Sequence, residues 1–164
     1  MLHIALDMAP EHPQYSLWRE RFYDRYAREL PNGAQWMPGM EELVDALDVR
    51  GLAWGIVTNK ASRFANPICE ELGIAKRAAC VVCGDTTPYT KPHPAPLRHA
   101  SAICDVPVAD CIYIGDDKRD IEAARAAGMR AIAARYGFLA PGDDPQSWNA
   151  DAVIGHPAEL IAIL

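Results

Sequence analysis

Short apolar runs alternate with amphipathic segments of helical period from residue 37 to the end of the chain. The apolar runs are typical of buried strands, and Gly, Pro or polar residues close them. This alternation predicts right-handed crossovers, a parallel sheet and helices on both faces of that sheet. The sequence therefore predicts an α/β core with strands at 52–59, 78–84, 111–115, 130–134 and 150–155.

The N-terminal part of the chain has a different pattern. Aromatic residues and Leu recur at steps of three and four over residues 15–30, which predicts an amphipathic helix. A break rich in Pro and Gly, residues 31–39, separates this helix from the alternating region. We therefore expect two parts, residues 1–36 and residues 37–164.

The composition limits the classes of function. The chain has 164 residues, of which 50% are hydrophobic, and this is enough for one domain with a core. A net charge of −6 argues against a nucleic-acid partner, and no apolar run reaches the length of a membrane span. Five cysteines, an odd number, indicate a reducing compartment. We expect a cytoplasmic protein without a nucleic-acid or membrane partner, and the oligomeric state stays open.

Two of the predicted strands lead into groups suited to phosphate. The strand at 52–59 ends in Thr58 and Asn59, which offer a hydroxyl and a backbone amide to phosphate oxygens. The loop after the strand at 78–84 contains Lys91, a cation in the rigid run "KPHP". Parallel strands bring their carboxyl ends to one edge of the sheet, where ligands of α/β proteins bind. Thr58, Asn59 and Lys91 are therefore candidate phosphate-binding residues.

A third strand, in "CIYIGDDKRD", ends in a cluster of acids. Asp116, Asp117 and Asp120 repel one another unless a cation or solvent screens them. Oxygen ligands suit Mg²⁺, so these three residues are candidate metal ligands. The alternative is that acids here cap and charge a helix N-terminus, and we keep it open for Asp117 and Asp120. Phosphate, lysine and Mg²⁺ together predict phosphoryl transfer.

The order of these motifs resembles the haloacid dehalogenase superfamily of Mg²⁺-dependent phosphatases. Thr58 in "IVTNK" is similar to its second motif, Lys91 in "TKPHP" to its third and "GDDKRD" to its fourth. The run "WGIVTNK" and the late "DAVIGHPAEL" resemble the phosphoglycolate phosphatases and the bacterial N-acetylmuramic acid 6-phosphate phosphatases. The resemblance implies a Rossmann-like core, a Mg²⁺ cofactor, catalytic roles for Lys91 and Thr58, and a small phosphorylated metabolite as substrate.

The first motif of that superfamily, an apolar strand ending in DxDGT, has no match in this sequence. Asp7 follows an apolar run in "HIALDMAP", but Ala9 stands where the second aspartate belongs. The resemblance implies that residues 1–36 are the C-terminal part of a helical cap and that residues 37–164 are an incomplete core. We therefore expect a missing central strand, which leaves unpaired edges on the strands ending at Thr58 and Gly115.

Two classes of function follow from these observations. The first is a phosphatase, with this chain a fragment, a protein with a misassigned start or a degenerate copy that is inactive alone. The second is a non-catalytic remnant that binds phosphate or a protein partner. The sequence does not decide between phosphoglycolate and N-acetylmuramic acid 6-phosphate as substrate.

Overall fold

The computed structural model describes residues 8–164. The chain forms two compact units, one ending at Ala34 and the other spanning Gln35–Leu164. The sequence placed this division two residues later. The assignment of the first unit to a cap stays a prediction.

The first unit contains the helix α2, Tyr15–Glu29, followed by the short 3₁₀ helix η1, Pro31–Gly33. The amphipathic helix expected at 15–30 is thereby confirmed. Its aromatic side chains contact one another, since the ring of Phe22 stacks on that of Tyr26 with centroids 6.0 Å apart. No residue of α2 is buried in the structure, and both Trp18 and Phe22 are 40% exposed.

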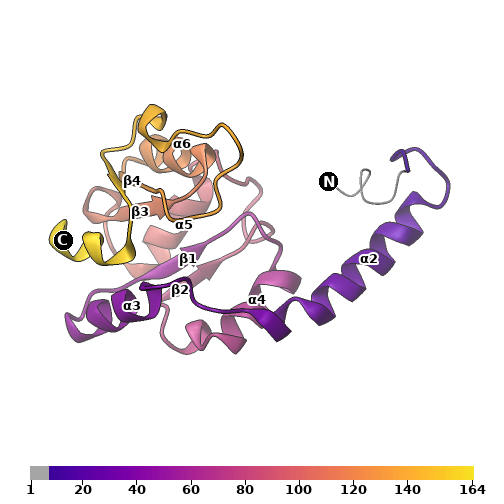
Figure 1. The fold of residues 1–164 in the computed structure, drawn as a ribbon, viewed down its shortest axis with the longest axis horizontal. Coiled ribbons are helices and arrows are strands. Elements are labelled where there is room, and N and C mark those ends of the chain that lie inside the picture. The colour runs from indigo at the N-terminus through magenta and orange to yellow at the C-terminus, as the bar shows by residue number, and fades with distance from the viewer. Residues whose placement is uncertain (1–7) are drawn as a thin grey trace. The chain divides into compact units, whose positions relative to one another are not determined.

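The second unit is built on five short strands, and every strand pairing is parallel (Figure 1). The strands form a two-stranded sheet, β1-β2, and a three-stranded sheet, β3-β4-β5. The predicted α/β class with parallel strands is confirmed. The strands are β1 (Gly55–Val57), β2 (Cys80–Val82), β3 (Ile112–Gly115), β4 (Arg130–Ala134) and β5 (Ala152–Ile154).

Helices connect these strands in the predicted alternation. The segment expected as a closing helix at 157–164 is a 3₁₀ helix at Pro157–Ala162. The α-helices are α3 (Met40–Val49), α4 (Ser62–Glu71), α5 (Ala95–Cys104) and α6 (Lys118–Ala127), and the 3₁₀ helices are η2 (Ile74–Lys76), η3 (Val108–Asp110), η4 (Pro145–Trp148) and η5 (Pro157–Ala162).

The central strand β4 shows why helices cover both faces of its sheet. Successive side chains of a strand point to opposite faces. Ala131 and Ala133 belong to a buried cluster with Ile121 of α6, whereas Ile132 belongs to another with Leu43 of α3. All five residues are nearly inaccessible to solvent. The apolar run "RAIAA" is therefore hydrophobic throughout because both of its faces are buried.

The two sheets leave a groove between β1 and β3. Within residues 8–164, β1 pairs only with β2, and β3 pairs with β4 alone. A cavity of about 600 Å³, here named the β1–β3 groove, is lined by Gly55–Val57 of β1 and Ile112–Gly115 of β3. The sequence predicted unpaired edges on these two strands, and the structure has them. Unpaired backbone groups on a strand edge favour the addition of a further strand.

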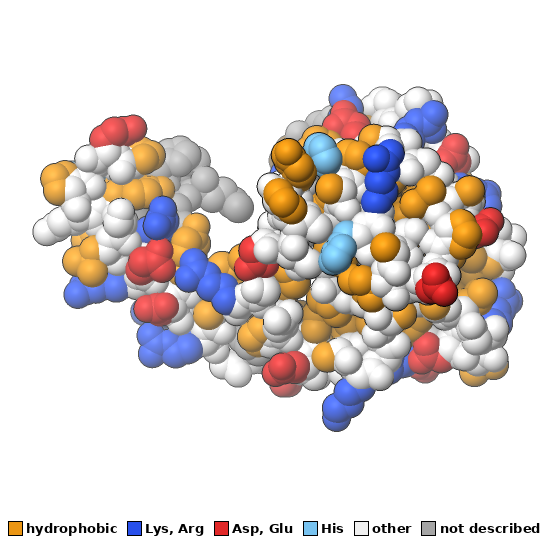
Figure 2. Space-filling model, turned by 180° about the vertical axis from the view of Figure 1, so that it is seen from behind, with side chains coloured by type: hydrophobic (Ala, Val, Ile, Leu, Met, Phe, Trp, Pro, Cys, Tyr) orange, Lys and Arg blue, Asp and Glu red, His pale blue; other side chains and the backbone are white. Residues whose placement is uncertain are grey.

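The surface carries charges of both signs. On the face shown in Figure 2, Lys and Arg side chains are interspersed with Asp and Glu rather than gathered in a basic patch. This distribution agrees with the net charge of −6, which is unfavourable for nucleic acid. None of the helices in the described part of the chain is long and apolar enough to cross a membrane.

Candidate active site

Thr58 directly follows β1 and is held by its backbone. Its N–H donates to the carbonyl of Val82, which extends the pairing of β1 with β2 by one bond of 2.9 Å. The hydroxyl Oγ1 accepts a hydrogen bond of 3.1 Å from the backbone N–H of Lys60. Because the oxygen accepts this bond, the hydroxyl hydrogen can be directed to a further acceptor. This position fits the predicted role at the carboxyl end of β1.

Asn59 acts on Lys91 through its side chain. The amide Nδ2 of Asn59 donates to the carbonyl of Lys91 at 2.9 Å, and the N–H of Lys91 donates to Oδ1 of Asn59 at 2.9 Å. This reciprocal pair fixes the loop after β2 against the turn after β1. The sequence predicted only that the backbone amide of Asn59 binds phosphate, and that role stays a prediction.

The ammonium of Lys91 lies at the end of β1, and the side chain is 9% exposed. Its Nζ donates to the carbonyl of Val57 at 2.8 Å and to the hydroxyl of Tyr113 at 2.7 Å. The same Nζ forms an ion pair with Oδ1 of Asp120 at 2.7 Å. Lys91 therefore connects the end of β1 with the first turn of α6, across the rim of the β1–β3 groove.

Tyr113 is a site residue that the sequence analysis did not select. Its hydroxyl donates to the carbonyl of Val57 at 2.9 Å while accepting from Lys91. Burial, and then the negative charge of Asp120, raises the pKa of this phenol well above its usual value. A signal was present, because a tyrosine in a buried strand needs a partner for its hydroxyl.

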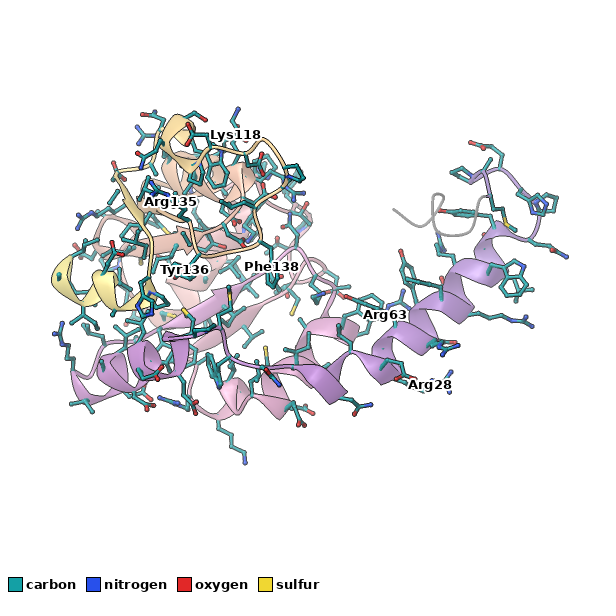
Figure 3. The ribbon with its side chains drawn as sticks, viewed as in Figure 1. Arg28, Arg63, Lys118, Arg135, Tyr136 and Phe138 are labelled. Atoms are coloured by element: carbon teal, nitrogen blue, oxygen red, sulfur yellow. The ribbon has the colours of Figure 1, made fainter. Side chains whose placement is uncertain are left out.

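Asp116 directly follows β3 and contacts the loop after β4. Its Oδ2 accepts a hydrogen bond of 2.7 Å from the N–H of Phe138. Gly137 lies so close that a Cβ there would be 2.1 Å from the Cβ of Asp116. Figure 3 shows Tyr136 and Phe138 on this same loop. Burial, and then Asp116, raises the pKa of the Tyr136 phenol.

Asp117 and Asp120 form a capping box at the start of α6. Asp117 accepts from the N–H of Arg119, and Asp120 accepts from the N–H of Asp117. The guanidinium of Arg119 also binds Asp117, and this lowers the pKa of that carboxyl to about 2. Asp120 is buried and is paired with Lys91. Both carboxylates therefore already have helix-capping and cationic partners, as the capping alternative expected.

The fit of Mg²⁺ to this end of β3 rests mainly on Asp116. Carboxylate oxygens are the ligands that Mg²⁺ takes, and the carboxylate of Asp116 accepts its hydrogen bond from the neutral N–H of Phe138. Residues 8–164 contain no group of three His, Cys, Asp or Glu side chains arranged to hold a metal ion. The Mg²⁺ ligand set of Asp116, Asp117 and Asp120 therefore stays a prediction.

A comparison with sequence profiles shows the family of the chain. Residues 5–134 match the sequence profile described as haloacid dehalogenase-like hydrolase. This match covers most of the chain, so the chain belongs to that family, and the predicted resemblance is confirmed.

Curated relatives with similar sequences are named as two kinds of phosphatase within this family. The chain is 40% identical over 164 residues to the N-acetylmuramic acid 6-phosphate phosphatase of Pseudomonas putida, across 100% of this chain and 74% of the relative. It is 44% identical over 139 residues to the phosphoglycolate phosphatase of Xanthomonas campestris pv. campestris, across 85% of this chain and 63% of the relative. These relatives are phosphatases of the subgroup that the motifs indicated.

A solved structure supports the fold. The crystal structure described as a predicted phosphoglycolate phosphatase from Haemophilus somnus superposes with a TM-score of 0.87. The superposition covers 98% of this chain and 71% of the Haemophilus somnus chain, and the two sequences are 24% identical. The likeness therefore extends over both the Rossmann-like core and the preceding segment, and it concerns the fold alone.

Proposed function

We propose that this chain provides the phosphate-binding half of a Mg²⁺-dependent phosphomonoester hydrolase of the haloacid dehalogenase-like family. The proposed substrate is a small phosphorylated metabolite, either phosphoglycolate or N-acetylmuramic acid 6-phosphate, because the relatives above bear those names. The observation that carries the proposal is the placement of Lys91. Its Nζ lies 2.8 Å from the carbonyl of Val57, the residue before Thr58, and 2.7 Å from Asp120.

The roles of the residues follow from their chemistry. Lys91 supplies a positive charge for phosphate oxygens, and Asn59 holds its backbone in place through two hydrogen bonds. Thr58 directs its hydroxyl hydrogen to a phosphate oxygen, since Oγ1 already accepts from Lys60. Asp116 is the proposed Mg²⁺ ligand, and bound Mg²⁺ would neutralise phosphate charge at the rim. Asp117 and Asp120 then act by orienting α6 and Lys91.

The proposal also concerns the nucleophile. Transfer through an aspartyl-phosphate needs a carboxylate that attacks phosphorus, and neither Thr58 nor Lys91 can replace it. In the described part of the chain, a groove lies between β1 and β3, and no strand with such a carboxylate lies there. Asp7 lies outside the described residues. We therefore propose that rapid turnover depends on an aspartate brought to this groove on a further strand.

Phosphate release tests this proposal. The 164-residue chain and a version preceded by an added apolar strand that ends in DxDGT are compared on both substrates, with and without Mg²⁺. We expect background rates from the first and Mg²⁺-dependent release from the second, because loss of a covalent nucleophile costs several orders of magnitude in rate. In the extended protein, Lys91→Ala and Asp116→Asn should abolish release.

Lys118→Ala is the matched control, since Lys118 is 65% exposed and its ion pair with Glu122, at 3.9 Å, lies at the surface. It should leave release unchanged. Mg²⁺-dependent release by the 164-residue chain that disappears on Asp7→Asn would instead make Asp7 the nucleophile. An extended protein that binds phosphate without turnover would contradict the enzyme and support the non-catalytic alternative.

A further inference from the structure

Two thiols lie next to each other at the edge of the sheet opposite the candidate active site. Cys80 is the first residue of β2, and Cys104 is the last residue of α5. Their sulfur atoms are 3.6 Å apart, with the thiol of Cys104 donating to Sγ of Cys80. Both residues line the β1–β3 groove, and both are free cysteines. No role in the proposed phosphatase uses them.

The two thiols differ in their surroundings. Cys80 is buried, and a Cβ added to Gly55 of β1 would lie 2.6 Å from its sulfur. Burial, and then the neighbouring Cys104, raises the pKa of the Cys80 thiol to about 12. Cys104 is only partly buried, at the end of a helix, so small reagents reach it more easily. Cys104 is therefore expected to react first, and Cys80 second.

A third cysteine nearby has other partners. The thiol of Cys111, just before β3, points to the carbonyl of Pro107 at 3.4 Å and to that of Val106 at 3.9 Å. The described residues include no group of three side chains arranged for a metal ion. The sulfur–sulfur contact of 3.6 Å between Cys80 and Cys104 therefore points to a dithiol rather than to a metal site.

We propose that Cys80 and Cys104 form a redox-active dithiol, which a small-molecule disulfide such as oxidised glutathione converts to an intramolecular disulfide. The Cys104 thiolate attacks one sulfur of glutathione disulfide and releases one glutathione thiolate. Cys80 then gives up its proton and attacks the Cys104 sulfur, which releases the second glutathione. Two protein thiols are oxidised, and one glutathione disulfide is reduced to two thiols.

The geometry makes the second step short. A disulfide has a sulfur–sulfur distance of about 2.05 Å, so the two atoms must approach by about 1.5 Å. Cys104 ends α5, and Asp105 after it has a left-handed backbone, so the helix does not continue beyond the thiol. The new bond would join the start of β2 to the end of α5, and both elements contribute residues to the lining of the groove. It should therefore raise the melting temperature of the second unit.

Peptide mapping tests the dithiol on the reduced 164-residue chain in native buffer. After incubation with oxidised glutathione, free thiols are alkylated, and the digested protein is examined by mass spectrometry. We expect a linked peptide pair containing Cys80 and Cys104, loss of two free thiols and a higher melting temperature. Cys111→Ser should give the same result, and Cys104→Ser should give no linked pair.

Several results would overturn the proposal. Glutathione retained on Cys104 without closure, a link between Cys104 and Cys111, or five thiols still free after incubation would each contradict it. If Cys104→Ser does not fold, the peptide map of the native chain alone decides, because it identifies the linked residues directly. A phosphatase assay plays no part in this test, so it is independent of the proposed function.

Discussion

The ion pair between Lys91 and Asp120 gives the sharpest test of how the candidate site is built. Both side chains are 9% exposed, and Nζ lies 2.7 Å from Oδ1. Replacing Lys91 with Met keeps most of the side-chain volume but removes the charge. Within residues 8–164, the carboxylate of Asp120 would then keep the hydrogen bond of 3.3 Å from the N–H of Asp117 but no cationic partner. Breaking a buried pair on one side costs about 3–5 kcal/mol.

The other two contacts of Lys91 add little to this cost. The hydroxyl of Tyr113 still donates to the carbonyl of Val57 at 2.9 Å after the ammonium is gone. Neither of these groups is left without a hydrogen bond. We therefore expect Lys91→Met to lower the free energy of unfolding by about 3–5 kcal/mol, mostly from the uncompensated charge of Asp120.

Urea denaturation followed by tryptophan fluorescence measures this change. Lys118→Met is the matched control, because Lys118 is 65% exposed and its pair with Glu122 should contribute at most about 0.5 kcal/mol. The double variant Lys91→Met with Asp120→Asn removes both charges and should be more stable than Lys91→Met alone. A loss below about 1 kcal/mol for Lys91→Met, equal to that of Lys118→Met, would refute the reasoning.

Three further predictions concern neighbouring contacts. Asn59→Ala removes both hydrogen bonds to the backbone of Lys91 and should lower the free energy of unfolding by about 1–3 kcal/mol, as measured by urea denaturation. An unchanged midpoint would show that this pair of hydrogen bonds does not stabilise the fold. Gly84→Ala should cost about 1–3 kcal/mol, because its Cβ would lie 2.3 Å from the carbonyl oxygen of Asn59, and a neutral result would refute that close approach. Asp117 has a folded-state pKa of about 2 against 3.8 unfolded, so its contribution is present above pH 3.8 and is lost as the pH falls toward 2. Between about pH 4 and 2, the free energy of unfolding should thus fall more steeply for the native chain than for Asp117→Asn. Equal slopes for the two proteins would contradict this prediction.

The sequence predicted β4 well because this strand is buried on both faces. The run "RAIAA" is apolar at every position, and the structure places Ala131 and Ile132 in clusters on opposite sides of β4. Parallel pairing then followed from the alternation with helices, since crossovers of that length connect parallel strands. The unpaired edges of β1 and β3 also followed, because the sequence has no match to an apolar strand ending in DxDGT.

The partners of individual side chains were harder to predict. Asn59 and Lys91 are distant in the sequence, and only the parallel pairing of β1 with β2 brings their loops together. Tyr113 lies in an apolar strand, and the sequence pattern of that strand predicts only that the side chain is buried. Its hydroxyl donates a hydrogen bond to the carbonyl of Val57 on the other side of the groove. Such contacts depend on the distance between two sheets, which no local pattern encodes. The proximity of Cys104 to Cys80 arises in the same way, from the packing of α5 on β2.

The hydrogen bonding of Lys91 also bears on what the isolated chain can do. An ammonium has three donors, and here three acceptors surround it: Val57, Tyr113 and Asp120. A phosphate oxygen that reaches Nζ must therefore replace one of them. The carbonyl of Val57 is the acceptor that loses least, because Tyr113 continues to donate to it.

A strand added in the groove would compete for that same edge of β1 and would release the Lys91 donor for phosphate. The arrangement at the rim thus agrees with the proposal that turnover needs a further strand. It gives a second reason, besides the nucleophile, to expect low activity of the 164-residue chain alone.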